Sequence, residues 1–186
     1  TAPAEHTPPA LAPQPQPEQQ AQQTTAPAPD AVPNRTVTIK SPLYEVTLDS
    51  KGALATSWII VNNESSMSEY AVHADGSSEG KQKPLQLISQ KVLEQEPREL
   101  PFRLSTGDQV LNADLNTRNY QVSVPEDTIT LGPGEERTIE FTFTGPSGVE
   151  AKKRFVFRGD SYVADLAIDL GQNGQPLPDA KLAIGA

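Results

Sequence analysis

The side chains in this sequence that offer catalytic or metal-binding chemistry are two histidines, scattered carboxylates and isolated serines. A zinc site needs closely spaced histidine or cysteine ligands, but His6 and His73 are far apart and the chain has no cysteine. Hydrolysis of a glycosidic bond needs two carboxyl groups within a few ångströms of each other. No spacing in the sequence brings such a pair together. The scattered carboxylates considered are Asp49, Glu69, Asp75, Asp108 and Asp165.

The serines and the single tryptophan stand in sequence contexts that do not indicate catalysis. Ser57, Ser89 and Ser161 lack the glycine-flanked strand–turn–helix context of a hydrolase nucleophile. Trp58 has the side chain for stacking on a sugar, but the apolar run 59–61 beside it favours a position in the core. We therefore expect no catalytic, cofactor-binding or metal-binding residues in this chain.

The composition narrows the classes of partner. The chain has 186 residues, a formal net charge of −9 and no tract rich in lysine or arginine, so we expect no nucleic-acid partner. Its longest strongly apolar run, residues 58–61, is far shorter than the ~20 residues that cross a bilayer. The sequence also starts within low-complexity sequence and without a methionine. We expect a soluble piece of a longer protein, with any signal peptide or membrane anchor outside it.

Residues 1–34 differ in composition from the rest of the chain. They hold 9 of the 18 prolines and six glutamines, and they contain no lysine or arginine. Such a segment cannot bury enough apolar surface to offset the entropy lost on ordering. Proline density favours an extended spacer, so the sequence predicts a disordered Pro/Gln-rich tether over 1–34. The alternative is that "PQPQPEQQAQQ" is a ligand for a proline-binding domain.

From residue 35 onward, short stretches of alternating apolar and polar residues are separated by glycine and proline turns. This pattern predicts an antiparallel β-sandwich over 35–186, because period-2 alternation is typical of half-buried strands. Residues 62–83 are polar and predict a long loop, whereas residues 89–97 are the nearest approach to a helical pattern but are too polar to indicate one. The expected strands are "TVTIK", "LYEVTLD", "ALATSWIIV", "PLQLIS", "NYQVSV", "RTIEFTFT", the two arms of "KKRFVFRGDSYVADLAIDL", and a last one at 182–184 where the fold is expected to be truncated.

The triplet Arg-Gly-Asp at 158–160 lies between two of these alternating runs. If Gly159 and Asp160 form a two-residue loop, glycine supplies the positive φ that such a turn needs, and a hairpin results. The competing interpretation is an exposed adhesion signal, but the hairpin accounts for more of the surrounding residues. We therefore expect Gly159 and Asp160 to be a structural turn. The hairpin pairs Phe157 with Tyr162, Phe155 with Ala164, and Arg154 with Asp165.

The same alternation predicts the aromatic core. On each strand the large side chains fall in phase on one face, which must be the face that packs inward. The expected core residues are Trp58, Phe141, Phe143, Phe155, Phe157 and Tyr162.

Three segments, taken in order, resemble the large periplasmic domain of the bacterial YidC family of membrane-protein insertases. The first is "VTIKSPLYEVTLDSKGALATSWII", which is similar to the opening strands of that domain. The second is "KPLQLIS", and the third is "KRFVFRGDSYVADLAIDL", with the Lys-x-Phe element, the basic-Gly-Asp turn and the tyrosine of the family pattern. The resemblance covers about residues 36–170.

This resemblance implies a β-supersandwich, similar to mutarotase-like domains, of which the chain holds a part. It also implies a non-enzymatic role in the insertion and folding of inner-membrane proteins, with or without the Sec translocon. The implied partners are nascent membrane proteins and the Sec auxiliary subunits, met through the full-length protein. The implied location is the periplasmic face of the inner membrane, with anchoring by segments outside this chain. The alternative is a secreted carbohydrate-binding or mutarotase-like β-sandwich module.

Overall fold

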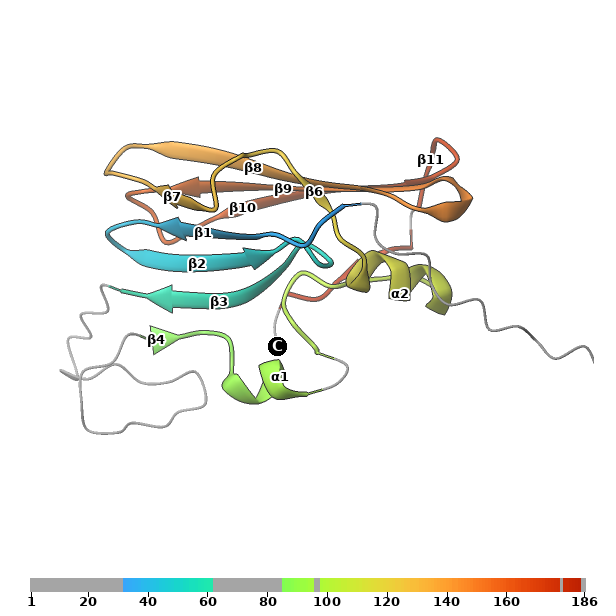
Figure 1. Ribbon diagram of the computed structural model, residues 1–186, viewed down its shortest axis with the longest axis horizontal. Coiled ribbons are helices and arrows are strands. Elements are labelled where there is room, and N and C mark those ends of the chain that lie inside the picture. Colours follow the sequence, from blue (N-terminus) through green and yellow to red (C-terminus); the bar gives the residue numbers. More distant parts are fainter. Residues whose placement is uncertain (1–31, 62–84, 96–97, 178, 185–186) are drawn as a thin grey trace, which may run out of the picture.

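Two five-stranded sheets pack face to face in the computed structural model, which describes residues 32–61, 85–95, 98–177 and 179–184 (Figure 1). The alternating segments form the strands, because each can place one row of side chains inward and the other in water. The first sheet has the order β4 (Leu85–Gln86), β3 (Leu54–Ile60), β2 (Tyr44–Asp49), β1 (Thr36–Lys40) and β7 (Thr128–Thr130). The second has the order β11 (Gln175–Pro176), β10 (Asp165–Gln172), β9 (Val149–Arg158), β8 (Glu136–Thr144) and β6 (Gln121–Val122).

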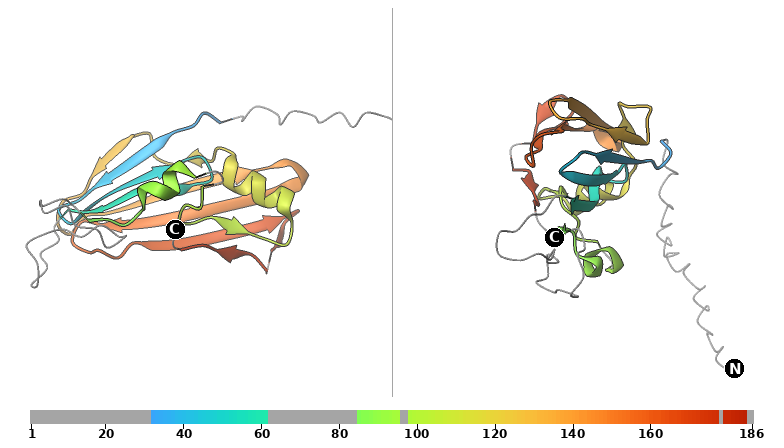
Figure 2. Two further views of the ribbon diagram at one scale, coloured as in Figure 1. Left: turned by 90° about the horizontal axis from the view of Figure 1, so that it is seen from below. Right: turned by 90° about the vertical axis from the view of Figure 1, so that its left-hand side faces the viewer.

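The predicted all-β sandwich of antiparallel strands is confirmed, and the described residues add one parallel pairing. β1 pairs in parallel with β7, through Thr38 opposite Thr128 and Ile39 opposite Ile129. A smaller antiparallel ribbon joins β5 (Leu104–Ser105) to β12 (Lys181–Leu182). The two views of Figure 2 show the sheets stacked as layers, with the helices and this ribbon beside them. The sequence did not predict β5, β7 or β11, because strands of two or three residues are too short to show a period.

The core lies between the two sheets. Along β2 every second residue is buried, and β8 and β9 show the same alternation. Four of the six expected core residues, all phenylalanines, are buried there: Phe141, Phe143, Phe155 and Phe157. Neighbouring rings in this core lie 5.2 to 6.1 Å apart, within the range of favourable aromatic contacts.

The other two expected core residues are less buried, and they differ from each other. Tyr162 is 48% exposed, so its placement in the core was wrong. Trp58 is half-buried at the margin of the core, with its ring 6.2 Å from Phe102 and 6.1 Å from Phe157. Trp58 faces inward, and in the described part of the chain β3 pairs on its outer side with the two-residue strand β4.

Two short helices connect the strands. α1 (Gln90–Glu94) lies within the segment 89–97, whose polar composition did not indicate a helix, and the Ser89 hydroxyl caps it by accepting from the backbone N–H of Lys91. α2 (Gln109–Thr117) was missed. Its Asp108 cap accepts from the N–H groups of residues 110 and 111, yet Leu115 is its one buried residue. A helix that buries so little carries a weak apolar period.

The hairpin of β9 and β10 has a different register from the predicted one. Phe155 lies opposite Leu166 and Val156 opposite Asp165, so β10 is shifted by two residues and the connection spans 159–164. A shift of two residues keeps every side chain on its predicted face, whereas a shift of one would reverse them. Phe155 and Phe157 therefore stay inward, while Tyr162 falls into the connection. Arg158 now pairs with Asp165, at 2.8 Å.

Residues 1–31, which make up most of the predicted tether, and the predicted loop 62–83 lie outside the described residues. Residues 32–35 contact the sandwich. The Asn119 side-chain amide donates to the Val32 carbonyl at 2.8 Å. Arg35 donates to the carbonyls of Val124 and Pro125 and pairs with Asp127 at 2.7 Å. These contacts hold the start of β1 against the segment before β7.

Candidate functional site

The most unusual side chain in the core is Lys153, which points inward from the middle of β9 and is fully buried. Its Nζ donates hydrogen bonds to the carbonyl oxygens of Gly52 at 2.7 Å, Ala53 at 3.3 Å and Phe102 at 2.6 Å. An ammonium group has three N–H donors, so three carbonyl acceptors satisfy it without a carboxylate. Lys153 thus connects the second sheet to the β2–β3 turn and to the segment before β5.

All three carbonyls belong to residues with positive φ: 73° at Gly52, 49° at Ala53 and 74° at Phe102. Alanine and phenylalanine rarely adopt this left-handed conformation, and it persists where surrounding contacts hold it. The bonds from Lys153 are such contacts. The sequence showed Lys153 only as part of the Lys-x-Phe element, and its inward phase on β9 was the signal that it would be buried.

Burial lowers the pKa of Lys153 to about 7. Removing an ammonium from water disfavours its charged form, while the carbonyl bonds favour that form. The ring of Tyr120 lies 5.6 Å from Nζ and offers its face to the cation. Burial also raises the pKa of Tyr120, whose hydroxyl donates to the Leu115 carbonyl at 2.9 Å.

The turn after β9 contains Gly159, and its backbone differs from the predicted one. Gly159 does not have a positive φ, so the predicted conformational reason for glycine was wrong. A Cβ built on Gly159 would overlap the carbonyl of Gly132, and the Gly159 N–H donates to the Glu135 carbonyl at 2.9 Å. Glycine is required here because two backbone segments meet without room for a side chain.

The Arg-Gly-Asp triplet is largely engaged within the fold. Arg158 pairs with Glu136 at 2.9 Å and with Asp165 at 2.8 Å, and Gly159 is buried. Asp160 is exposed. An adhesion receptor would need the arginine side chain accessible, so this geometry argues against the adhesion interpretation and favours a structural turn.

Replacing Gly159 with alanine is expected to destabilise the fold by about 2 kcal/mol, because the new methyl group must displace the backbone at Gly132. The matched control is Gly107→Ala, since Gly107 has open space around its Cβ position and no positive φ. That control should leave stability unchanged or raise it slightly. Urea denaturation of both variants measures the difference. Equal stability of the two variants would contradict the close approach at Gly159.

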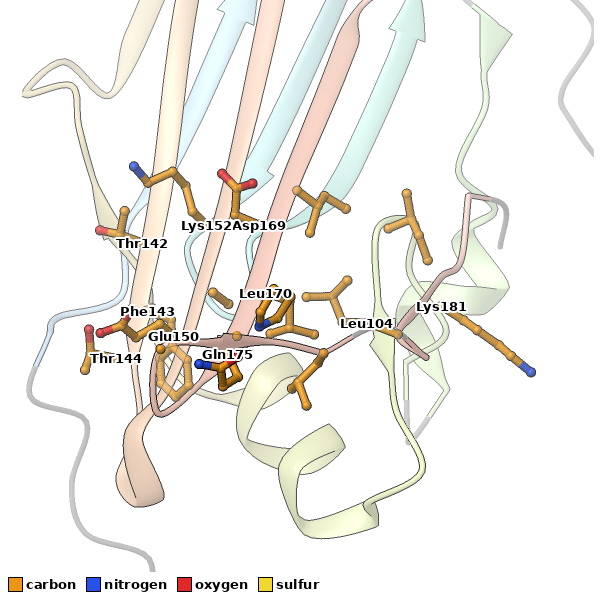
Figure 3. A pocket seen from close by; sticks show the side chains of 18 residues that line it. Leu104, Thr142, Phe143, Thr144, Glu150, Lys152, Asp169, Leu170, Gln175 and Lys181 are labelled. Carbon is orange, nitrogen blue, oxygen red and sulfur yellow. The ribbon is translucent and has the colours of Figure 1, made fainter.

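A groove of about 760 Å³ lies where β9 begins and β10 ends, beside the β5–β12 ribbon (Figure 3). Its apolar lining includes Leu104 and Leu170, and Lys181 at its rim extends away from it. The inward residues of β10, Leu166, Ile168 and Leu170, pack on the core but are only half-buried. The groove therefore offers apolar surface with charged side chains around it.

The carboxylates that could have formed a catalytic or metal site do not come together in the described residues. Asp49 accepts from Asn34 and from the Lys51 backbone, Asp108 caps α2, and Asp165 pairs with Arg158. The described part of the chain holds no group of three His, Cys, Asp or Glu side chains arranged for a metal ion. The remaining candidates, His6, His73, Glu69 and Asp75, lie outside the described residues.

The serines serve the backbone or a neighbouring side chain. Ser57 accepts from the Gln86 amide at 2.7 Å, and the Ser161 hydroxyl accepts from the Val163 N–H at 3.1 Å. Ser89 caps α1. These contacts assign local structural roles to all three.

Comparison with known proteins decides the family. The model of the YidC periplasmic domain matches residues 36–181, which is most of the chain. The chain belongs to the YidC periplasmic domain family. The matched range runs from β1 to the start of β12, so it includes both sheets, Lys153 and all the residues that line the groove except Leu182. The family predicted from three ordered segments is thereby confirmed.

A curated relative of this YidC domain is the membrane protein insertase YidC of Geobacter sulfurreducens, which is 37% identical over 54 residues. The match covers 28% of this chain and 10% of the relative. The aligned residues thus span about a tenth of the length of that insertase. No helix in the described ranges is long and apolar enough to cross a membrane.

Proposed function

We propose that this chain is the non-catalytic periplasmic part of a membrane-protein insertase, which assists the insertion and folding of inner-membrane proteins with or without the Sec translocon. The observation that carries this proposal is the family match over residues 36–181. The named relative, an insertase, supports the same assignment. In this proposal residues 35–186 form the folded periplasmic unit and residues 1–34 form its tether.

We further propose that membrane segments outside this sequence anchor the domain at the periplasmic face of the inner membrane. The domain itself would work by contact and not by reaction, since the described carboxylates and serines with catalytic side-chain chemistry serve turns, caps, ion pairs and neighbouring side chains. The expected partners of the full-length protein are nascent membrane proteins and the Sec auxiliary subunits. Half-buried apolar side chains line the groove, and covering them would remove apolar surface from water, which is favourable. This lining supports contact between the domain and apolar segments of its partners.

This function is tested by depleting the full-length protein in its own bacterium. The readout is the insertion of a short inner-membrane protein, measured by its protection from added protease. We expect the substrate to remain uninserted after depletion and to insert again when the gene is restored. In cells with the outer membrane opened, added protease should degrade this domain, and fractionation should recover it with the inner membrane.

Two results would refute the proposal. One is normal insertion of every substrate after depletion. The other is recovery of the domain as a free periplasmic protein, which would favour the secreted sugar-binding module instead. In that case, sugars should shift the fluorescence of Trp58, the single tryptophan of the chain. The insertase proposal expects no such shift.

A further inference from the structure

Lys153 helps to hold in place a short segment that is also fixed by the β5–β12 pairing and by the Asn116 side chain, which bonds to the backbone of Leu104. We define the Phe102 segment as residues 101–104, which lead into β5. The Phe102 N–H donates to the Ala183 carbonyl at 2.6 Å, and its ring lies 5.2 Å from Phe155. Its carbonyl accepts from Lys153 at 2.6 Å. The Phe102 segment therefore lies over the buried ammonium and is one of the elements that keep water from it.

We propose that Lys153 makes the docking of the Phe102 segment depend on protonation, so that docking is weakest at neutral pH and strengthens as the pH rises. When the segment is docked, the ammonium is removed from water and has carbonyl oxygens as its partners. When the segment lifts away, water reaches the ammonium and stabilises its charge. The undocked form therefore binds the proton more tightly than the docked form.

The sign of the pH dependence follows from this difference. A lysine in water titrates at a pKa near 10.4, whereas burial lowers the pKa of Lys153 to about 7 in the docked form. Between these two values the undocked form carries more protons, so raising the pH favours docking. One linked proton changes the docking equilibrium by up to about tenfold per pH unit. Below pH 7 both forms are protonated and the dependence disappears.

In the described residues, the contacts of the Lys153 Nζ are three backbone carbonyls and the Tyr120 ring, and none of them is a carboxylate. Its neighbours in register, Phe141 on β8 and Ile168 on β10, do not titrate. Burial is the cause of its lowered pKa, with no carboxylate contributing. The titratable groups on the packed segments are Asp49 and Lys51 at the β2–β3 turn, Arg103 next to Phe102 with its partner Glu99, the pair Asp114 and Arg118 at α2, and Tyr120.

Hydrogen exchange of the Phe102 amide between pH 7 and pH 9.5, corrected for the intrinsic exchange rate, tests the proposal on the 186-residue chain. We expect its protection factor to rise by up to about tenfold per pH unit in the natural sequence. The rise should disappear in Lys153→Met, which keeps the length of the side chain but cannot titrate. The matched control is Lys152→Met, since Lys152 is the adjacent residue on the outer face of β9, and it should keep the full rise.

A second measurement covers the case in which Lys153→Met does not fold. In the natural sequence, one Cε signal of the ¹³C-labelled lysines should titrate at a pH well below that of the others. That signal should be lost in Lys153→Arg or shift on denaturation. Three outcomes would overturn the proposal: a flat or falling protection factor in the natural sequence, the same rise in Lys153→Met, or titration of every lysine near its ordinary pKa.

Discussion

Replacing Phe155 with alanine is expected to lower the free energy of unfolding by about 4 kcal/mol. Phe155 is buried between the sheets, with its ring edge-on to Phe102 at 5.2 Å and to Phe141 at 5.8 Å. The substitution removes these contacts and leaves a cavity in a core that both sheets share. Urea denaturation followed by circular dichroism measures the loss.

Two controls separate the core contact from a general effect of substitution on β9. Phe155→Leu keeps an apolar side chain and should lose less than half as much stability as the alanine variant. Val156→Ala changes the next residue, which lies on the outer face, and should cost about 1 kcal/mol or less. If Phe155→Ala were no worse than Val156→Ala, the predicted inward face of β9 would be wrong.

Replacing Lys153 with methionine is expected to cost about 3 kcal/mol of stability at pH 7. Methionine fills a similar volume but donates no hydrogen bond, so the buried carbonyls of Gly52, Ala53 and Phe102 lose the donor that satisfies them. Two of these residues are non-glycine residues with positive φ, and their conformations lose a supporting contact as well.

The deficit of Lys153→Met should widen as the pH rises. The folded-state pKa of Lys153 is lowered to about 7, so the unfolded chain binds more protons between pH 7 and about pH 10. The natural protein therefore gains stability through this range, and the variant does not. Lys152→Met should match the natural protein within about 0.5 kcal/mol at both ends of the range. A variant as stable as the natural protein at pH 9 would show that the lysine contributes nothing to folding.

Much of the fold was predictable because the alternation of apolar and polar residues identifies its long strands from local sequence alone. β1, β2 and β8 were predicted within one residue of their bounds and β9 within three, since each alternates apolar and polar side chains over five residues or more. The burial of Phe155 and Phe157 followed from the same alternation. The family was predicted from three ordered segments, because strand phase, turn residues and the Lys-x-Phe element occur together there.

Features that depend on contacts between distant segments were not predictable in this way. The sequence predicts a two-residue connection after β9, whereas the connection has six residues, because local sequence does not set where β10 resumes its pairing. The need for glycine at position 159 comes from the backbone at Gly132, which is far away in sequence. α2 was missed because Leu115 alone is buried on it, so its stability depends on its Asp108 cap and on its neighbours.

The sequence by itself determined which residues face inward on the long strands, because side-chain direction alternates with every residue along a strand whatever the strand packs against. It therefore contained the sandwich, its phenylalanine core and the inward phase of Lys153. Only the tertiary structure decided what these residues meet. Lys153 became a satisfied cation because three carbonyls from two other segments converge on it, and Trp58 is only partly buried because it packs at the margin of the core, where β3 pairs with the two-residue strand β4. Such environments are created by chain segments up to 101 residues apart, so no local pattern encodes them.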